Sequence, residues 1–174
     1  MAASLSHLAG YKGRLTVTHQ TGEADLERIK AAYAESEFAD ADVRPFISDM
    51  FVEFGNADLV VCRAGATTCA ELGAAGKASI MVPLPTAADD HQRKNAEAFE
   101  RAGASKMLVQ TDLSGESLSQ AIIELIESPD LVSKMEEAAR KLGRADAAEA
   151  TVDLIEQLSA RRKVSSGKKE LANV

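Results

Sequence analysis

The stretch from residue 56 to residue 92 constrains the fold of this chain more than any other. It reads NADLVVCRAGATTCAELGAAGKASIMVPLPTAADDHQ. An apolar, strand-like run at 58–61 leads into a turn around Gly65, and a helix-like segment follows that turn. A second apolar run at 78–82 then enters a proline-rich loop. Strand, glycine turn and helix N-terminus are how α/β proteins hold phosphate-bearing ligands, because backbone N–H groups and the positive helix end face the anion.

The remainder of the chain repeats this alternation of strand-like and helix-like segments. Short apolar and β-branched runs predict strands, and apolar residues at helical spacing predict helices. The predicted strands are 14–19, 42–46, 58–62, 78–82 and 105–109, and the predicted helices are 24–36, 48–54, 68–75, 89–102, 117–127, 129–142 and 145–160. This order predicts an α/β fold, in which a parallel sheet carries helices on both faces.

The start of the chain differs from that of a complete doubly wound sheet, which normally opens with a strand and a glycine-rich phosphate turn. Residues 1–12 predict only the end of a helix or a frayed arm, and the first strand-like run comes after them. We therefore expect the sheet to lack its first strand, and the chain to start inside the first helix.

Composition excludes several classes of protein. The 174 residues suffice for one domain with a core, and no apolar run is long enough to predict a membrane span. The N-terminal residues lack the pattern of a signal peptide. A net charge of −7 and the absence of tryptophan argue against nucleic-acid binding. Cys62 and Cys69 do not form a C-x-x-C pair, so we interpret them as reduced, cytosolic cysteines.

Common catalytic and cofactor motifs are missing from the sequence. It contains no P-loop, no G-x-S-x-G elbow, no H-E-x-x-H and no G-x-G-x-x-G. Asp89, Asp90 and His91 are metal-ligand types, but adjacent side chains at a helix start splay apart. We therefore predict neither a metal site nor a cofactor, and assign no catalytic residue within this chain.

Glu71 has two interpretations. With Thr68 it fits T-x-x-E, the capping box in which a glutamate binds the backbone N–H of the helix N-cap. Alternatively, Glu71 faces the crevice at the strand ends and accepts hydrogen bonds from the paired hydroxyls of a ribose, as acidic residues do in dinucleotide folds. The spacing by itself favours the capping box. Gly65 is likewise either a turn residue or part of a phosphate-binding loop.

Other polar residues near predicted strand ends also have two interpretations. His91 and Gln92 stand at a solvated helix start capped by a preceding aspartate, or they present imidazole and amide groups to sugar hydroxyls. His19 is either a ligand contact or a capped strand end. Arg63 either meets phosphate or pairs with an acid of the domain.

The segment ADLVVCRAGATTCAELGAAGKASIMVPLPTAADDHQRKNA closely resembles the donor-binding half of the MurG family, within glycosyltransferase family 28. The resemblance runs from about Leu15 to Leu158 and includes VTHQTGE and VRPFISDM. Members of this family are bacterial hexosyltransferases that add N-acetylglucosamine to the lipid-linked muramyl-pentapeptide precursor of peptidoglycan. The resemblance implies the C-terminal half of a two-domain GT-B fold, with a Rossmann-like domain that binds UDP-N-acetylglucosamine. It also implies an inverting transfer without a covalent enzyme intermediate.

The resemblance implies roles for particular residues. It places the backbone of Ile47 at the edge of the uracil base and Glu71 at the ribose hydroxyls. His91 and Gln92 correspond to the pair that contacts the sugar. The residues of the diphosphate loop and helix start are Gly65, Ala66, Thr67 and Thr68. For Glu71 this implied role replaces the capping box as our expectation, although both roles can coexist.

The sequence departs from the family pattern in two ways. Ala78 stands where the family usually has proline. The family's N-terminal acceptor domain, which carries the catalytic base, is missing, as are the first strand and glycine-rich loop of the donor domain. We therefore expect residues 1–160 to form an N-terminally incomplete donor-binding domain, followed by a disordered basic and polar tail at 161–174.

Two functions stay open on this basis. The chain is the donor half of a transferase and inactive alone, or it is a non-catalytic nucleotide-sugar-binding subunit that needs a partner chain with the acceptor domain. A truncated, unstable product is a third interpretation. The expected partners are UDP-N-acetylglucosamine and the acceptor domain, through which alone a lipid-linked acceptor would bind. The expected location is the cytoplasm or, for the full-length enzyme, the cytoplasmic face of the inner membrane as a peripheral protein.

Overall fold

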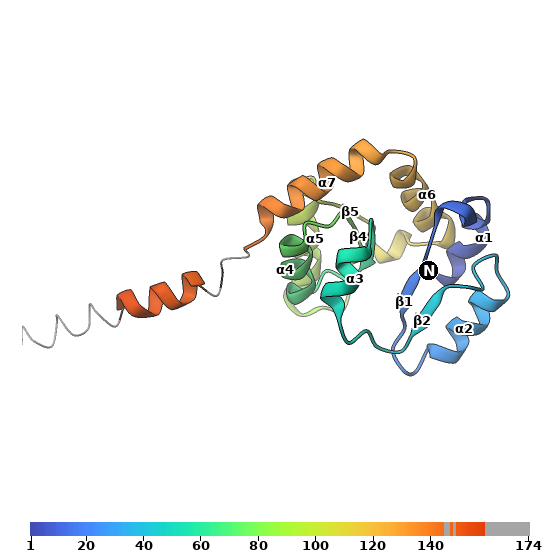
Figure 1. Cartoon of the computed structure of the whole chain (residues 1–174), viewed down its shortest axis with the longest axis horizontal. Coiled ribbons are helices and arrows are strands. Elements are labelled where there is room, and N and C mark those ends of the chain that lie inside the picture. Colours follow the sequence, from blue (N-terminus) through green and yellow to red (C-terminus); the bar gives the residue numbers. More distant parts are fainter. Residues whose placement is uncertain (145–146, 148, 159–174) are drawn as a thin grey trace, which may run out of the picture. The chain divides into compact units, whose positions relative to one another are not determined.

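The structure is a computed structural model that describes residues 1–144, 147 and 149–158 (Figure 1). Its chain divides into two compact units, residues 1–143 and residues 144–174, and each is considered by itself. All predicted site residues belong to the first unit. The predicted tail at 161–174 lies outside the described residues.

Five short parallel strands form the framework of the first unit. They fall into two sheets, a pair and a triplet, with the orders β1-β2 and β3-β4-β5. The strands are β1 (Thr18–Gln20), β2 (Asp42–Arg44), β3 (Val60–Cys62), β4 (Ser79–Met81) and β5 (Ser105–Met107). The predicted α/β architecture is therefore confirmed, although every strand is shorter than its hydrophobic run.

The division into two sheets leaves β1 and β3, as well as the outer strands β2 and β5, with one unpaired edge each among the described residues. Within the described residues, β1 pairs only with β2, and β3 pairs only with β4. One doubly wound sheet would have a further strand between such halves. The predicted lack of a first strand thus corresponds to a sheet that is interrupted, instead of one that is merely shorter at one edge.

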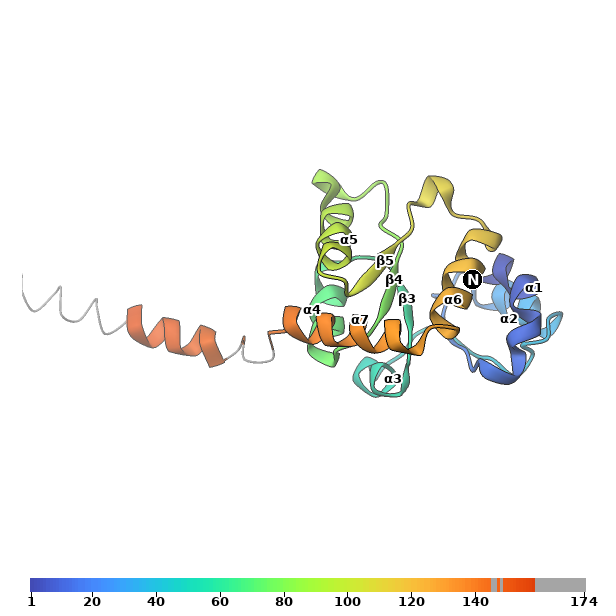
Figure 2. The same ribbon diagram turned by 90° about the horizontal axis from the view of Figure 1, so that it is seen from above.

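Helices connect the strands and cover them (Figures 1 and 2). The α-helices of the first unit are α1 (Leu5–Leu8), α2 (Leu26–Ala34), α3 (Met50–Asn56), α4 (Ala66–Ala75), α5 (His91–Arg101), α6 (Gly115–Ile126) and α7 (Pro129–Leu142). This unit also has 3₁₀ segments at Ala2–Ser4, Ala9–Arg14, Ala88–Asp90 and Gln110–Asp112. In the second unit, residues 149–158 are helical. None of the helices in the described part of the chain has the length and hydropathy that crossing a membrane requires.

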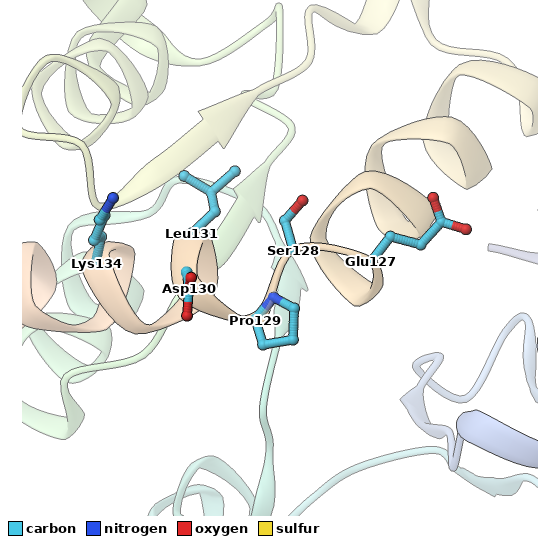
Figure 3. Close-up of a pocket in the computed structure, with 6 residues that line it drawn as sticks. All are labelled: Glu127, Ser128, Pro129, Asp130, Leu131 and Lys134. Atoms are coloured by element: carbon cyan, nitrogen blue, oxygen red, sulfur yellow. The ribbon is translucent and has the colours of Figure 1, made fainter.

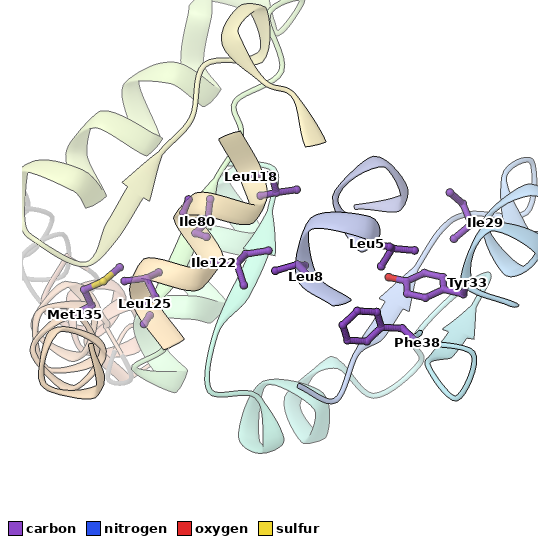
Figure 4. Close-up of a cluster of buried hydrophobic side chains, with 12 residues drawn as sticks. Leu5, Leu8, Ile29, Tyr33, Phe38, Ile80, Leu118, Ile122, Leu125 and Met135 are labelled. Atoms are coloured by element: carbon purple, nitrogen blue, oxygen red, sulfur yellow. The ribbon is translucent and has the colours of Figure 1, made fainter. Parts of the chain in front are cut away.

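Side chains of the triplet alternate between two apolar clusters. Val61 and Ile80 contact the cluster drawn in Figure 4, to which α1, α2 and α6 also contribute. Val60 and Met81 contact a second cluster, built mainly by α3, α4 and α5. This alternation places helices on both faces of the triplet, which explains why its strands read as continuous apolar runs.

The N-terminal segment is part of the core and not the frayed arm that was one of our expectations. Leu5 and Leu8 on α1 are buried beside Leu118 and Ile122 of α6 (Figure 4). The start of α6 approaches this segment so closely that a Cβ atom on Gly115 would lie 1.9 Å from the carbonyl oxygen of Ala3. Glycine is therefore required at that contact.

Candidate functional site

The predicted site residues lie after the carboxyl ends of the strands. Because all pairings are parallel, the carboxyl ends within each sheet lie at the same edge. Ile47 follows β2, Gly65 follows β3, and His91 follows the long loop after β4. Ligands of open α/β sheets bind at this edge, so the topology brings each sheet's predicted contacts to the expected side.

The loop after β3 leads directly into helix α4. Gly65 is the N-cap residue, with extended φ and ψ of −65° and 151°, and no side chain caps the helix. The N–H groups of Ala66, Thr67 and Thr68 have no acceptor among the described residues. The first N–H groups of a helix have no intrahelical partner and point along its positive dipole end. Three backbone donors are thus available to an anion.

The chain itself does not explain why residue 65 is glycine. A Cβ atom there would meet only Thr68 Oγ1 within 4 Å, at an ordinary 3.7 Å, and the φ value is accessible to any residue. Because glycine has no side chain, a ligand can closely approach the three open N–H groups. This is the effect that a phosphate-binding loop requires.

Two long side chains hold this loop in place. Asn95 on α5 donates from Nδ2 to the carbonyl oxygen of Ala64 at 3.0 Å. Arg63 donates from Nη1 to the carbonyl oxygen of Val82 at 3.1 Å and to Gln110 Oε1 at 2.7 Å. The expectation that Arg63 pairs with an acid is therefore wrong, because Arg63 donates to neutral oxygens beyond β4 and β5. The sequence does not reveal this bracing, because the partners are far apart in the chain.

Glu71 does not form the capping box that its spacing suggested. Helix α4 begins at Ala66, so Thr68 lies inside the helix instead of at its N-cap. The Glu71 side chain is exposed, and within the described residues it has no hydrogen bond or ion pair. It lines a cavity of about 170 Å³ between α3 and α4, together with Met50, Phe51, Phe54, Ala74 and Ala75. The carboxylate is thus free to accept hydrogen bonds from a ligand.

His91 and Gln92 are fixed by the loop that precedes them. The N–H of Leu84 donates to Gln92 Oε1 at 3.0 Å, and His91 Nδ1 donates to the carbonyl oxygen of Ala88 at 2.6 Å. Asp90 is the N-cap residue of α5 but makes no side-chain cap bond, so the capped helix start is not observed. These contacts leave the Gln92 Nε2 group and the far edge of the His91 ring without a partner in the described chain.

Positive φ angles shape the same loop. Asp89 and Asp90 have φ values of 50° and 56°, in the left-handed region where aspartate is tolerated better than most residues. Two consecutive residues of this kind turn the chain sharply into α5. The loop therefore delivers His91 and Gln92 at the helix start, which the sequence pattern alone did not reveal.

Ile47 lies in the loop between β2 and α3 and is buried, whereas the neighbouring Phe46 is 70% exposed. The backbone N–H of Ile47 donates to Gln20 Oε1 at 2.8 Å. No hydrogen bond to the Ile47 carbonyl is found among the described residues. Asp49 caps α3 by accepting from the N–H of Val52 at 3.1 Å.

His19 is half-buried and contacts the core residue Tyr33. Its Nδ1 and the Tyr33 hydroxyl are hydrogen-bonded at 3.2 Å, and the two rings meet edge to face. Burial, together with the positive charge of the N-terminal amine, lowers the pKa of His19. Burial also raises the pKa of Tyr33 and of the Cys62 thiol to about 12 each. The neutral forms of these three groups are therefore favoured at neutral pH.

A larger cavity of about 470 Å³ lies where α6 meets α7 (Figure 3). It is lined by Glu127, Ser128, Pro129, Asp130, Leu131 and Lys134. None of the predicted site residues reaches it. Within the described part of the chain, no group of three or more potential ligand side chains could hold a metal ion.

Comparison with known proteins identifies relatives of this arrangement. The family model of the glycosyltransferase family 28 C-terminal domain matches residues 2–155. A UDP-N-acetylglucosamine–N-acetylmuramyl-(pentapeptide) pyrophosphoryl-undecaprenol N-acetylglucosamine transferase of Geotalea uraniireducens is 51% identical over 153 residues, which are 88% of this chain and 42% of that protein. The protein of the same name from Geobacter sulfurreducens is 50% identical over 163 residues, which are 94% of this chain and 44% of that protein.

Solved structures give the same result. A crystal structure of Acinetobacter baumannii MurG is similar with a TM-score of 0.75 and 35% identity, over 90% of this chain and 46% of that one. The glycosyltransferase VinC, in complex with dTDP, has a TM-score of 0.65 at 16% identity and shares the fold. The fold is thus Rossmann-like and corresponds to the C-terminal half of a GT-B protein. The chain spans less than half the length of the curated relatives described here.

Proposed function

The chain belongs to the glycosyltransferase family 28 C-terminal domain family, and from this membership we propose that it is the UDP-N-acetylglucosamine-binding half of an inverting transferase of peptidoglycan synthesis. The whole enzyme would transfer N-acetylglucosamine to a lipid-linked muramyl-pentapeptide. The names of the Geotalea and Geobacter relatives state this activity, and these relatives are more than twice as long as the matched region.

The observation that carries this proposal is an open anion site beside a free carboxylate. The N–H groups of Ala66, Thr67 and Thr68 have no acceptor in the described chain. Glu71 lies one turn further along α4, and its side chain has no donor among the described residues. Backbone donors suit a diphosphate, and a carboxylate suits the two hydroxyls of a ribose. A nucleoside diphosphate carries both groups in adjacent positions.

The remaining predicted residues extend the site on either side. In this proposal, the backbone of Ile47 contacts the uracil base, and His91 and Gln92 contact the sugar. Gly65 leaves room for the diphosphate. Support for the sugar contact comes from the Gln92 amide, whose oxygen is held by the Leu84 N–H so that its NH₂ group is left to donate.

The chemistry that these residues supply is stabilisation of the leaving group. As the bond between sugar and UDP breaks, negative charge develops on the diphosphate. Fixed N–H donors at the start of α4 would stabilise that charge without reorganising. We propose that the base for the acceptor hydroxyl belongs to the acceptor domain, so that this chain binds the donor but does not turn it over alone.

The alternative function is a non-catalytic nucleotide-sugar-binding subunit that acts with a separate acceptor chain. Both functions place the acceptor, and any contact with the cytoplasmic face of the inner membrane, on the partner portion. They differ in whether one polypeptide carries both portions.

Binding and turnover measurements test the proposal together. We expect the chain to bind UDP-N-acetylglucosamine in saturation-transfer NMR, and to bind ATP and NAD more weakly. Radiolabelled N-acetylglucosamine should not be transferred to the lipid-linked acceptor by this chain alone. Transfer should appear when a polypeptide with the acceptor domain, a first donor-domain strand and its glycine loop is added. Robust turnover by the chain alone, or equal binding of ATP, would refute the proposal.

A further inference from the structure

Gln20 lies beside the proposed base contact. It is the last residue of β1, its side chain is exposed, and its Oε1 accepts a hydrogen bond from the backbone N–H of Ile47 at 2.8 Å. The atom that Gln20 binds is therefore one of the backbone groups that the proposed function assigns to the uracil base.

This hydrogen bond is not needed to hold the two loops together. Directly after β1, the N–H of Thr21 donates to the carbonyl of Arg44, and the N–H of Gly22 donates to the carbonyl of Pro45, both at 3.0 Å. The backbone alone thus continues the pairing of β1 with β2 into the loops. Gln20 adds a side-chain contact to a junction that is already closed.

The orientation of the Gln20 carboxamide follows from chemistry. A backbone N–H can only donate, so the oxygen of the amide faces Ile47 and its NH₂ group faces elsewhere. In the part of the chain that the structure describes, neither this NH₂ group nor the Ile47 carbonyl has a hydrogen-bond partner. A carboxamide presents an acceptor next to a donor, which is also the pattern of O4 and N3–H on uracil.

We propose that the Gln20 side chain occupies the position of the nucleobase in the free protein, and that uracil must displace it to reach Ile47. The proposal rests on the proposed function, because it requires a uracil nucleotide at this loop. One N–H makes one good hydrogen bond, so base and side chain compete for it. Breaking a neutral hydrogen bond of this kind changes an equilibrium constant by about two- to tenfold.

Two substitutions at residue 20 separate competition from support. Gln20→Met keeps the length of the side chain but removes the acceptor, so UDP should bind about two- to tenfold more tightly than to wild type. Gln20→Glu keeps an acceptor and adds charge, which strengthens its hold on the N–H, so UDP should bind more weakly. Gln120→Met, on the exposed side of α6, is the matched control and should leave UDP affinity unchanged.

The Ile47 amide provides a direct readout by NMR of the full chain. In the free protein, its hydrogen exchange should be faster in Gln20→Met than in wild type. Addition of UDP should slow exchange in both proteins and shift the Ile47 amide resonance.

The outcomes distinguish this inference from the function on which it rests. If wild type binds UDP but Gln20→Met binds it equally or more weakly, Gln20 supports the loop and the competition is refuted. A wild-type Ile47 amide that UDP does not perturb refutes the competition even if the variants fail to fold. Failure of wild type to bind UDP would overturn both the inference and the proposed function.

Discussion

The two sheets of this domain differ in how they are held, although both present a loop to the proposed ligand. The middle strand of the triplet, β4, is buried along its whole length and pairs on both edges. In the pair, Thr18, Gln20 and Asp42 are exposed, and each strand has one partner. The triplet carries the proposed diphosphate and sugar contacts, and the pair carries the proposed base contact.

This difference teaches that one site can combine a rigid part with an adjustable part. The loops after the triplet are braced by Arg63, Asn95 and Gln92, whose partners lie on neighbouring segments. The loop after β2 is held to β1 by two backbone hydrogen bonds and by Gln20. We therefore expect the triplet to dominate stability and the pair to adjust affinity.

The largest expected effect is a loss of stability when the core of the triplet is changed. Ile80 is fully buried, so Ile80→Ala should lower the free energy of unfolding by about 2–5 kcal/mol through lost burial and a cavity. Val43 on β2 is only partly buried, and Val43→Ala should cost about 1 kcal/mol. Urea unfolding of both variants measures the contrast. Equal losses would show that the two sheets contribute alike.

The next effect concerns ligand binding at the rigid part of the site. Glu71→Ala should weaken UDP-N-acetylglucosamine binding by about 1.5–3 kcal/mol, the range for hydrogen bonds to a charged group. Stability should change little, because Glu71 has no partner within the described residues. Glu137→Ala, at an exposed position of α7, is the matched control. Calorimetry and thermal unfolding together decide, and a loss of stability with unchanged binding would make Glu71 structural.

A smaller effect on stability is expected at helix α6, which contacts both α1 and the triplet. Helix α6 packs on α1 and on the triplet, and Ser114 and Ser117 form a reciprocal capping box at its start. Ser114→Ala should lower stability by about 1 kcal/mol, while the exposed Ser133→Ala should not. If chemical denaturation shows no difference between the two variants, the cap does not stabilise the packing of α6 on α1 and the triplet.

The smallest effect is a pH dependence located in the pair. The pKa of His19 is lowered in the folded protein by burial and by the N-terminal positive charge. Below the ordinary value of 6.5, the unfolded chain therefore binds a proton that the folded chain resists. Stability should be full above this pH and fall as pH is lowered from it toward the folded pKa.

Unfolding measured across this window tests the assignment. His19→Asn should flatten the pH dependence, whereas the exposed control His7→Asn on α1 should preserve it. A dependence that survives His19→Asn would place the titrating group elsewhere in the molecule.

The second unit offers a separate expectation from its sequence. Helical spacing places Ala148, Val152, Ile155 and Ser159 on one face, with Leu154 and Leu158 beside it, and so predicts an apolar stripe; Ala148 and Ser159 lie outside the described residues. Val152, Leu154, Ile155 and Leu158 are each at least 54% exposed. Making Val152 and Ile155 polar should raise solubility in light scattering. An unchanged, monomeric protein would contradict this.

The sequence by itself determined the elements and their order. Continuous apolar runs such as 78–82 are typical of strands covered on both faces, and the alternation with helices restricted the sheet to parallel pairing. The similarity to family 28 also located the candidate residues. Those inferences depend on local patterns of side chains, which a sequence displays directly.

Only the tertiary structure decided how the site is assembled. In the structure α4 begins at Ala66, so Thr68 and Glu71 do not form the capping box that their spacing suggests. The path of the chain out of β3, and not the local four-residue pattern, sets where the helix begins. The tertiary structure also brought Gln20 to Ile47, across 27 positions of the chain. A hydrogen bond between distant residues depends on the register of β1 with β2, and that register exists only once the strands have paired.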